Sequence, residues 1–175
     1  MTTATPRMIL TALMAFLATA GYAESDPIAA VQKEIDRTVW RVFQNAFERM
    51  DGEALNSVYA DEVLRVAPDG IDTQSQFKQS NKKRFAANIA NGDRITLDFW
   101  FDSRQTNMTT SYDVGFYRVG ITAQSGTTDY FYGQFHIVLN KINGRWKIVQ
   151  DWDTASIGGR PITATDFDRQ PHARF

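Results

Sequence analysis

The pattern that most constrains this chain is the order of its two hydrophobic periods. Apolar residues recur every three or four positions over most of the stretch from Ile28 to Ile89, and they alternate with polar residues in most of the chain after Arg94. The first period is typical of amphipathic helices and the second of half-buried strands. Because the helices precede the strands, the sequence predicts an α+β fold, in which a curved antiparallel sheet packs on three N-terminal helices. Such a sheet forms a cone that can hold a pocket at its wide end.

The first two helices are predicted from their end signals. Asp26-Pro27 is a capping carboxylate followed by proline at the first helical position, so we expect the first helix to begin there. Asp51-Gly52 ends that helix. A short second helix is expected to carry residues 55–62, ending in the segment Tyr-Ala-Asp-Glu.

A brief strand and a third helix follow. The strand is predicted over 63–66, and it stops at the turn Pro68-Asp69-Gly70. Residues 73–76 fit a capping box that starts the third helix, and Gly92 is its expected end. The residues of this helix expected to face inward are Phe77, Phe85 and Ile89.

Four long strands account for the second half of the chain. They are predicted over residues 95–102, 112–121, 130–141 and 146–154. The links at 124–126 and 142–144 have the length and residue types of β-hairpins, which predicts an antiparallel meander. Residues 157–175 contain Gly158, Gly159, Pro161 and Pro171 and show no period, so we expect a C-terminal tail in loop form, either a flap or a dimer arm.

The first 23 residues have the pattern of a secretory signal peptide. Arg7 is the only charged residue before Glu24, an apolar run covers 8–18, and Gly-Tyr-Ala at 21–23 is a plausible cleavage site. A membrane anchor is the alternative, but the run is shorter than the roughly 20 residues that span a bilayer. We therefore expect a signal peptide at 1–23, a folded domain at 24–156, a periplasmic or secreted location, and no membrane association after cleavage.

Composition limits the classes of partner and cofactor that the chain is expected to bind. The chain has a formal net charge of −1 and no basic run, so nucleic acid is not an expected partner. It has no cysteine and only two histidines, His136 and His172, so packing instead of disulfides must hold it together, and a Cys/His zinc site is excluded. No phosphate-binding glycine loop or metal cluster is present in the sequence, and we expect no cofactor and no metal.

Two segments carry a resemblance to a known family. The helix end Tyr-Ala-Asp-Glu at 59–62 and the hairpin and strand Asn-Gly-Arg-Trp-Lys-Ile at 143–148, in this order of elements, resemble the nuclear transport factor 2-like superfamily, and most of all its SnoaL-like and ketosteroid-isomerase-like branches. The resemblance covers residues 27–155. It implies a cone-shaped pocket between sheet and helices and a homodimer. It implies no particular reaction, because members of one fold perform many functions.

One reaction of that superfamily can be tested by position. Ketosteroid isomerases use a tyrosine donor, a general-base aspartate and a protonated aspartate. Ungapped counts from the two resembling segments place Phe43 at the position of the tyrosine, Ala67 at that of the general base and His136 at that of the protonated aspartate. Phe43 and Ala67 can neither take a proton nor stabilise a developing charge. We therefore predict that the chain is not a steroid isomerase.

His136 is the candidate acid or base. On the strand 130–141, Tyr132 and Gln134 share the face of His136, whereas Phe135 and Ile137 lie on the other face. The isomerase-like count places His136 in the pocket. The more apolar character of the opposite face favours the reverse, and a dimer could bury one of the two faces. We expect the pocket placement, with a simple hydrogen-bonded strand histidine as the alternative.

Aromatic residues provide the other candidates. The predicted pocket-lining residues are Trp40, Phe43, Phe47, Tyr59, Ala67, Trp100, Tyr132, Gln134 and Trp152. Ordinary core and dimer packing is the alternative role for the aromatic ones. The strand carboxylates Asp98, Asp151 and Asp153 are expected on a solvated sheet face. Arg65 and Arg118 could hold an anionic ligand, although surface ion pairs are the commoner fate of arginine.

Three hypotheses for function follow. The first is an exported domain that binds a small apolar or aromatic molecule and has no catalytic set. The second is an acid–base enzyme, a cyclase, dehydratase or isomerase, that uses His136. The third is a dimeric protein-interaction module, suggested by the second apolar sheet face.

Overall fold

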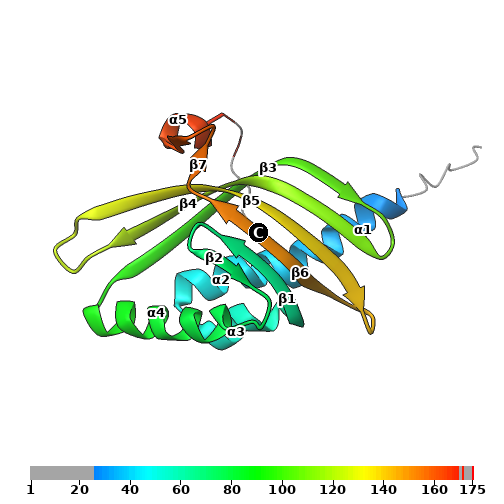
Figure 1. Ribbon diagram of the computed structural model, residues 1–175, viewed down its shortest axis with the longest axis horizontal. Coiled ribbons are helices and arrows are strands. Elements are labelled where there is room, and N and C mark those ends of the chain that lie inside the picture. The colour runs from blue at the N-terminus through cyan, green and yellow to red at the C-terminus, as the bar shows by residue number, and fades with distance from the viewer. Residues whose placement is uncertain (1–25, 170, 172–174) are drawn as a thin grey trace, which may run out of the picture.

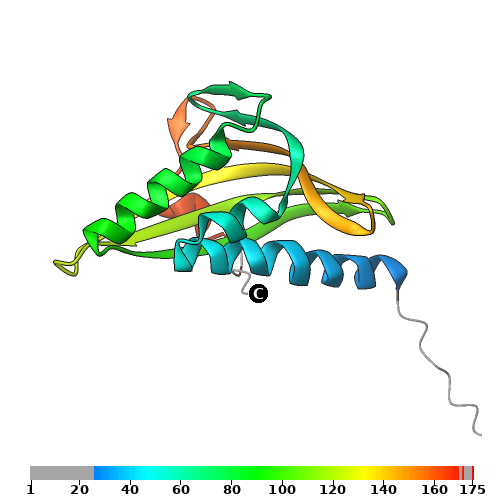
Figure 2. The same ribbon diagram turned by 90° about the horizontal axis from the view of Figure 1, so that it is seen from below.

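Helices cover one face of a curved six-stranded sheet (Figures 1 and 2). A computed structural model describes residues 26–169, 171 and 175, so the predicted signal peptide lies outside the described residues. The helical elements on this face are α1 (Pro27–Ile35), a π-helical turn η1 (Asp36–Trp40), α2 (Arg41–Arg49), α3 (Gly52–Ser57) and α4 (Phe77–Asn91). Among the described residues, no helix has both the length and the apolar character needed to cross a membrane.

The N-terminal helix begins and ends where the sequence predicts, but it is not regular throughout. Asp26 accepts a hydrogen bond from the backbone N–H of Ile28 (2.9 Å), and Pro27 occupies the first turn. The π-helical turn η1 was not predicted. It lies beside a buried hydrogen bond from Trp40 Nε1 to Asp113 Oδ2 (2.8 Å), which ties the helix to the sheet. At the other end, Met50 is left-handed (φ 54°) and separates α2 from α3.

The predicted second helix is wrong at its end. Residues 59–62 belong to strand β1 (Tyr59–Ala67), because β1 pairs with the last long strand, far away in the sequence. A hydrogen bond from Ile148 N to Val58 O (2.9 Å) starts that pairing. The helix-favouring residues Ala60 and Glu62 are thus overridden by tertiary pairing.

Helix α4 also differs from prediction in two details. Asp72, and not the predicted capping box, starts it, because Asp72 Oδ2 accepts a hydrogen bond from Phe77 N (2.7 Å). Gly92 ends it in a left-handed conformation (φ 70°), as predicted. Phe77 and Phe85 face inward, but Ile89 is 56% exposed. The inward stripe continues through polar residues instead.

The meander of four long strands is confirmed, but the sheet is mixed instead of antiparallel. The strands are β1, β2 (Gly70–Asp72), β3 (Arg94–Thr106), β4 (Thr110–Thr122), β5 (Thr128–Ile142) and β6 (Arg145–Thr154), in the spatial order β2-β1-β6-β5-β4-β3. Strands β3 to β6 pair antiparallel, whereas β1 returns to pair parallel with β6. The parallel pair is possible because the chain from β1 to β6 includes α4 and three strands.

A β-bulge in β6 reverses the faces of that strand. Leu139 of β5 lies opposite Ile148, whereas the preceding Val138 lies opposite Gln150, so Val149 is the extra residue. Before the bulge, Ile148 faces the helices. After it, Asp151 takes the inner position and Trp152 the outer one.

The C-terminal tail has more structure than predicted. It contains the short pair β7 (Ser156–Ile157) and β8 (Arg160–Pro161) and the turn of helix α5 (Ala164–Phe167). Helix α5 lies on the convex face of the sheet (Figure 1). Phe167 of this helix is fully buried and packs with Ile162 against Trp100 and Phe116. Hydrogen bonds from Arg160, with those of the Thr163 cap, hold the pKa of Asp166 well below its usual range. The sequence does not predict this packing, because residues 157–175 show no hydrophobic period.

Candidate functional site

A cavity of about 300 Å³ lies between the concave face of the sheet and helices α2 and α4. Much of its wall is apolar and aromatic, with contributions from Trp40, Phe43, Phe47, Phe99, Phe131 and Phe135. Several of these rings contact one another edge-on or tilted, as between Trp40 and Phe99 (5.4 Å between centroids). The size and the lining are those of a site for a small ligand with an apolar body.

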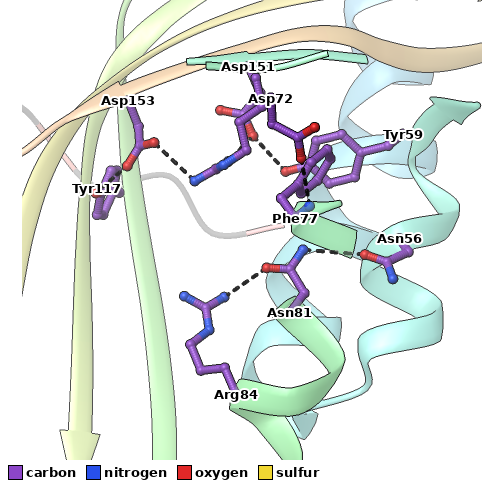
Figure 3. A network of polar contacts seen from close by, with 10 residues as sticks. Asn56, Tyr59, Asp72, Phe77, Asn81, Arg84, Tyr117, Asp151 and Asp153 are labelled. Atoms are coloured by element: carbon purple, nitrogen blue, oxygen red, sulfur yellow. Dashed lines mark hydrogen bonds and ion pairs between the residues drawn. The ribbon is translucent and has the colours of Figure 1, made fainter. Parts of the chain in front are cut away.

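One end of the cavity carries a polar cluster, defined as Tyr59, Arg65, Tyr117, Asp151 and Asp153. Arg65 joins the two carboxylates, with Nη1 2.7 Å from Asp151 Oδ2 and Nη2 3.0 Å from Asp153 Oδ1. Each carboxylate also accepts from a phenol. Tyr59 donates to Asp151 Oδ2 (2.7 Å) and Tyr117 to Asp153 Oδ2 (3.1 Å). Figure 3 shows these tyrosines and aspartates from close by. Of these five residues, only Tyr59 was among the predicted pocket residues.

Strand register brings the polar cluster together. Arg65 of β1 lies directly opposite Asp151 of β6 in the parallel pair, and Asp153 follows two residues later on the same face. Gly133 of β5 completes the arrangement, because the ring of Tyr117, its partner on β4, occupies the space where a side chain at position 133 would lie. A Cβ atom at position 133 would come within 2.3 Å of the Tyr117 hydroxyl. Only glycine therefore allows Tyr117 to reach Asp153.

Burial shifts the pKa of three members of the polar cluster, Asp151, Tyr59 and Tyr117. It raises the pKa of Asp151 above its usual value, and the charge of Arg65 and the hydrogen bond from Tyr59 offset this only in part. Burial, with the nearby aspartate charges, also raises the pKa of both Tyr59 and Tyr117. The two phenols are thus donors at neutral pH, and Asp151 is the carboxyl that binds a proton more readily than a solvent-exposed aspartate does.

Arg84 of α4 adds a positive charge to the lining of the same cavity. Its guanidinium lies over the rings of Phe47 and Phe85, 5.2 Å from each centroid, and Nη2 donates to Asn81 Oδ1 (3.3 Å). Within the described part of the chain it has no carboxylate partner. Burial lowers the pKa of Arg84, and the charge of Arg65 contributes in the same direction. Figure 3 shows Arg84 and Asn81 facing the polar cluster from the helix. Arg84 can therefore donate to an acceptor on a bound ligand.

Four of the nine predicted pocket residues line this cavity, namely Trp40, Phe43, Phe47 and Tyr59. The other five do not. Ala67 lines a separate hollow beside the β1–β2 hairpin. Trp100 and Tyr132 lie on the convex face, where they pack against the tail. By strand alternation Gln134 lies on that face too, and the β6 bulge turns Trp152 toward it.

The placement of His136 in the pocket is wrong. His136 is exposed on the convex face, where its ring meets that of Trp152 edge-on (4.5 Å between centroids). The more apolar residues of β5, Phe135 and Ile137, face the helices, as expected for the side of a strand that meets a core. Without a place in the cavity, His136 does not serve as the acid or base of this site.

The expectation of solvated strand carboxylates is also wrong. Asp151 is 4% exposed and Asp98 is 3% exposed. Asp98 pairs with Arg118 on the other side of the sheet (2.8 Å), where Arg118 also lies over the Phe167 ring. Sequence reasoning missed Asp151 and Asp153 because regular alternation from Ile148 puts them outside. Within residues 26–169, no group of three His, Cys, Asp or Glu side chains could hold a metal ion.

Comparison with known proteins identifies the fold. No protein-family model matches the sequence, and no curated protein matches it significantly. Solved structures do match. A conserved protein from Planctomyces limnophilus is 17% identical, with a TM-score of 0.61, over 72% of this chain and 96% of that one. An NTF-2-like protein of unknown function from Shewanella oneidensis is 16% identical, with a TM-score of 0.57, over 71% and 98%.

A third similar structure is described as a putative dehydratase from the NTF2-like family of Streptomyces avermitilis. It is 14% identical, with a TM-score of 0.58, and the match covers 78% of this chain and 99% of that one. Identities this low carry no function across. The agreement of the backbones over nearly the whole of each matched chain shows that this protein has the nuclear transport factor 2-like fold.

Proposed function

We propose that this chain binds a small, largely aromatic or apolar molecule in its cavity, with the polar group of that molecule at the polar cluster and Arg84. The observation that carries the proposal is the division of the cavity into an apolar body and one polar end. The side chain of Asp153 is 21% exposed, and it can accept a further hydrogen bond. A ligand hydroxyl suits this end, because it can donate to Asp153 and accept from Arg84.

Filling the cavity should abolish binding. Val119 of β4 lines the cavity and is half-buried, so Val119→Trp places an indole in the space of the ligand. We expect the variant to bind 2-naphthol, an aromatic molecule with one hydroxyl, at least tenfold more weakly than the unaltered chain, a loss of about 1.4 kcal/mol. Isothermal titration calorimetry measures the affinity of both chains for 2-naphthol.

The matched control is Val114→Trp. Val114 lies in the same strand on the opposite face of the sheet. We expect this variant to retain the affinity for 2-naphthol. Equal affinities in Val119→Trp and the unaltered chain, or the absence of any 2-naphthol binding together with purified protein that carries no small molecule by mass spectrometry, would contradict the proposal.

A second candidate function is acid–base catalysis by the polar cluster. The specific observation is that Arg65 holds two carboxylates in different environments. Burial favours the protonated form of Asp151, whereas Asp153 is more exposed and can act as a base. This candidate replaces the predicted mechanism through His136.

Proton abstraction can be tested without knowledge of the natural substrate. The probe is 2-tetralone, an aromatic ketone with acidic protons beside its carbonyl, dissolved in D₂O. If Asp153 is a base, the unaltered chain should accelerate deuterium incorporation, and Asp153→Asn should reduce that acceleration by about 100-fold or more while 2-naphthol still binds. Incorporation at the uncatalysed rate with both chains excludes proton abstraction from this class of ketone.

The cellular location and the oligomeric state are proposals from the sequence. We propose that the chain is exported after cleavage of residues 1–23 and that it forms a homodimer. Tyr112 and Tyr130, which are 54% and 53% exposed on the convex face outside the area covered by the tail, support the second point. A monomeric mass for the mature chain in analytical ultracentrifugation would contradict it.

A further inference from the structure

A second hollow, which we call the groove, adjoins the cavity. It has a volume of about 660 Å³ and lies between the β1–β2 hairpin and the N-terminal half of α4. Arg65, Asn81 and Arg84 line both this groove and the cavity. The two spaces therefore meet at the polar end of the cavity, and a ligand that fills the cavity has its polar end at the entrance of the groove.

The groove is polar and offers unused hydrogen-bonding groups. Among the described residues, the side chains of Asp69, Thr73 and Ser80 have no hydrogen-bond partner, and all three line it. By contrast, Asp72 is occupied, because its two carboxylate oxygens cap the start of α4. A carboxylate and two hydroxyls that face one space can accept from and donate to several groups of a ligand.

The charges of the groove do not select a charged ligand. Arg65 is already paired with two carboxylates. Of the remaining charged groups, Arg84 is positive, and Asp69 and Asp72 are negative, so an anionic head meets the two aspartates and a cationic head meets Arg84. A neutral head with several hydroxyls meets neither repulsion, and it can form hydrogen bonds with Arg84 and Asp69.

We infer that the natural ligand is an amphiphile, with an aromatic or apolar body in the cavity and an uncharged, hydroxyl-rich head in the groove. The junction between the two parts of the ligand lies beside Arg65, Asn81 and Arg84. This inference rests on the proposed binding function, and it adds a second binding subsite and the chemical class of the ligand.

The test compares three ligands with the same aromatic body. They are 2-naphthol, 2-naphthyl β-D-glucopyranoside and 2-naphthyl phosphate. Each is titrated into the full chain, tail included, and its affinity is measured by calorimetry. We expect the glucoside to bind at least tenfold more tightly than 2-naphthol, and the phosphate to bind more weakly than the glucoside. Ser80→Trp, which fills the groove from the exposed side of α4, should remove the advantage of the glucoside and leave the affinity for 2-naphthol within twofold.

The control variant is Ala86→Trp. Ala86 is exposed on the same helix and lines neither the cavity nor the groove, so all three affinities should stay within twofold. A glucoside that binds no better than 2-naphthol overturns the inference and leaves the proposed function intact. The inference is also overturned if the advantage of the glucoside survives in Ser80→Trp with an unchanged melting temperature, or if the phosphate binds as tightly as the glucoside. Both results leave the proposed function intact. If neither 2-naphthol nor the glucoside binds, the proposed function and the inference both fail.

Discussion

Replacement of Arg65 with leucine is expected to lower the free energy of unfolding by about 3–5 kcal/mol at pH 7. The Asp151 side chain is only 6% exposed, and Arg65 supplies its nearest positive charge, 2.7 Å away. Removal of Arg65 leaves a buried carboxylate with the Tyr59 hydroxyl as its remaining partner. Urea unfolding followed by circular dichroism measures the loss, which is large compared with the total stability of a typical domain.

The deficit of Arg65→Leu should shrink as the pH falls. Burial already raises the pKa of Asp151 in the folded state, and loss of Arg65 removes a charge that opposes this shift. A carboxyl with a higher pKa in the folded than in the unfolded state binds more protons when folded, so its stability contribution is present below the unfolded pKa and is lost as pH rises through the folded pKa. The variant should therefore be closer to the unaltered chain at pH 4 than at pH 7.

A matched control distinguishes burial from the mere loss of an ion pair. Lys82→Leu breaks the pair between Lys82 and Glu53, both of which are exposed, and should cost less than about 1 kcal/mol. Equal losses in Arg65→Leu and Lys82→Leu at pH 7 would show that the polar cluster does not depend on Arg65.

Trp40→Ala is the second substitution with a large expected effect, a loss of about 4 kcal/mol or more. Trp40 is 1% exposed, and it lies where the π-helical turn meets the sheet. Truncation of a buried aromatic side chain alone costs about 3–5 kcal/mol. It also removes the indole N–H donor from the fully buried Asp113, which keeps Ser111 and Arg104 as partners, and the loss of a hydrogen bond to a charged group adds about 1–3 kcal/mol.

Two comparisons separate these contributions. Trp40→Phe keeps most of the packing and removes the donor, so it should cost about 1–3 kcal/mol. Trp152→Ala removes the same side chain from the partly exposed outer face of β6 and should cost less than Trp40→Ala. If denaturant unfolding gives equal losses for Trp40→Ala and Trp152→Ala, the hydrogen bond and the packing at the π-helical turn do not hold the helix to the sheet.

Local signals in the sequence predict the arrangement of elements well. Asp26-Pro27 starts the first helix, Gly92 ends α4, and the hairpin residues at 142–144 join two strands, because each of these is a property of a few neighbouring residues. The start of β1 at Tyr59 could not be predicted in the same way. That strand exists because it pairs with β6, nearly 90 residues away in the sequence.

The candidate site was predicted in part, and the errors on β6 have one structural origin. The aromatic residues of α2 and η1 follow from a helical period, which is reliable over a long helix. On a strand, alternation assigns faces only while the register is regular. The bulge at Val149 breaks the register, and so Trp152 was predicted inside and Asp151 and Asp153 outside. For His136, the more apolar opposite face gave the correct signal, and a position count across a family gave the wrong one.

The bulge in β6 also bears on how binding sites can diverge within this fold. Deletion of Val149 would remove the extra residue and leave Gln150 opposite Val138, so every later side chain of the strand would keep its partner and its face. The acidic pair would stay in the interior and Trp152 would stay outside it. A change of one residue in chain length can therefore be absorbed at the bulge without a change in the site, and an ungapped alignment with a relative that lacks the bulge would pair non-equivalent residues on one side of this point.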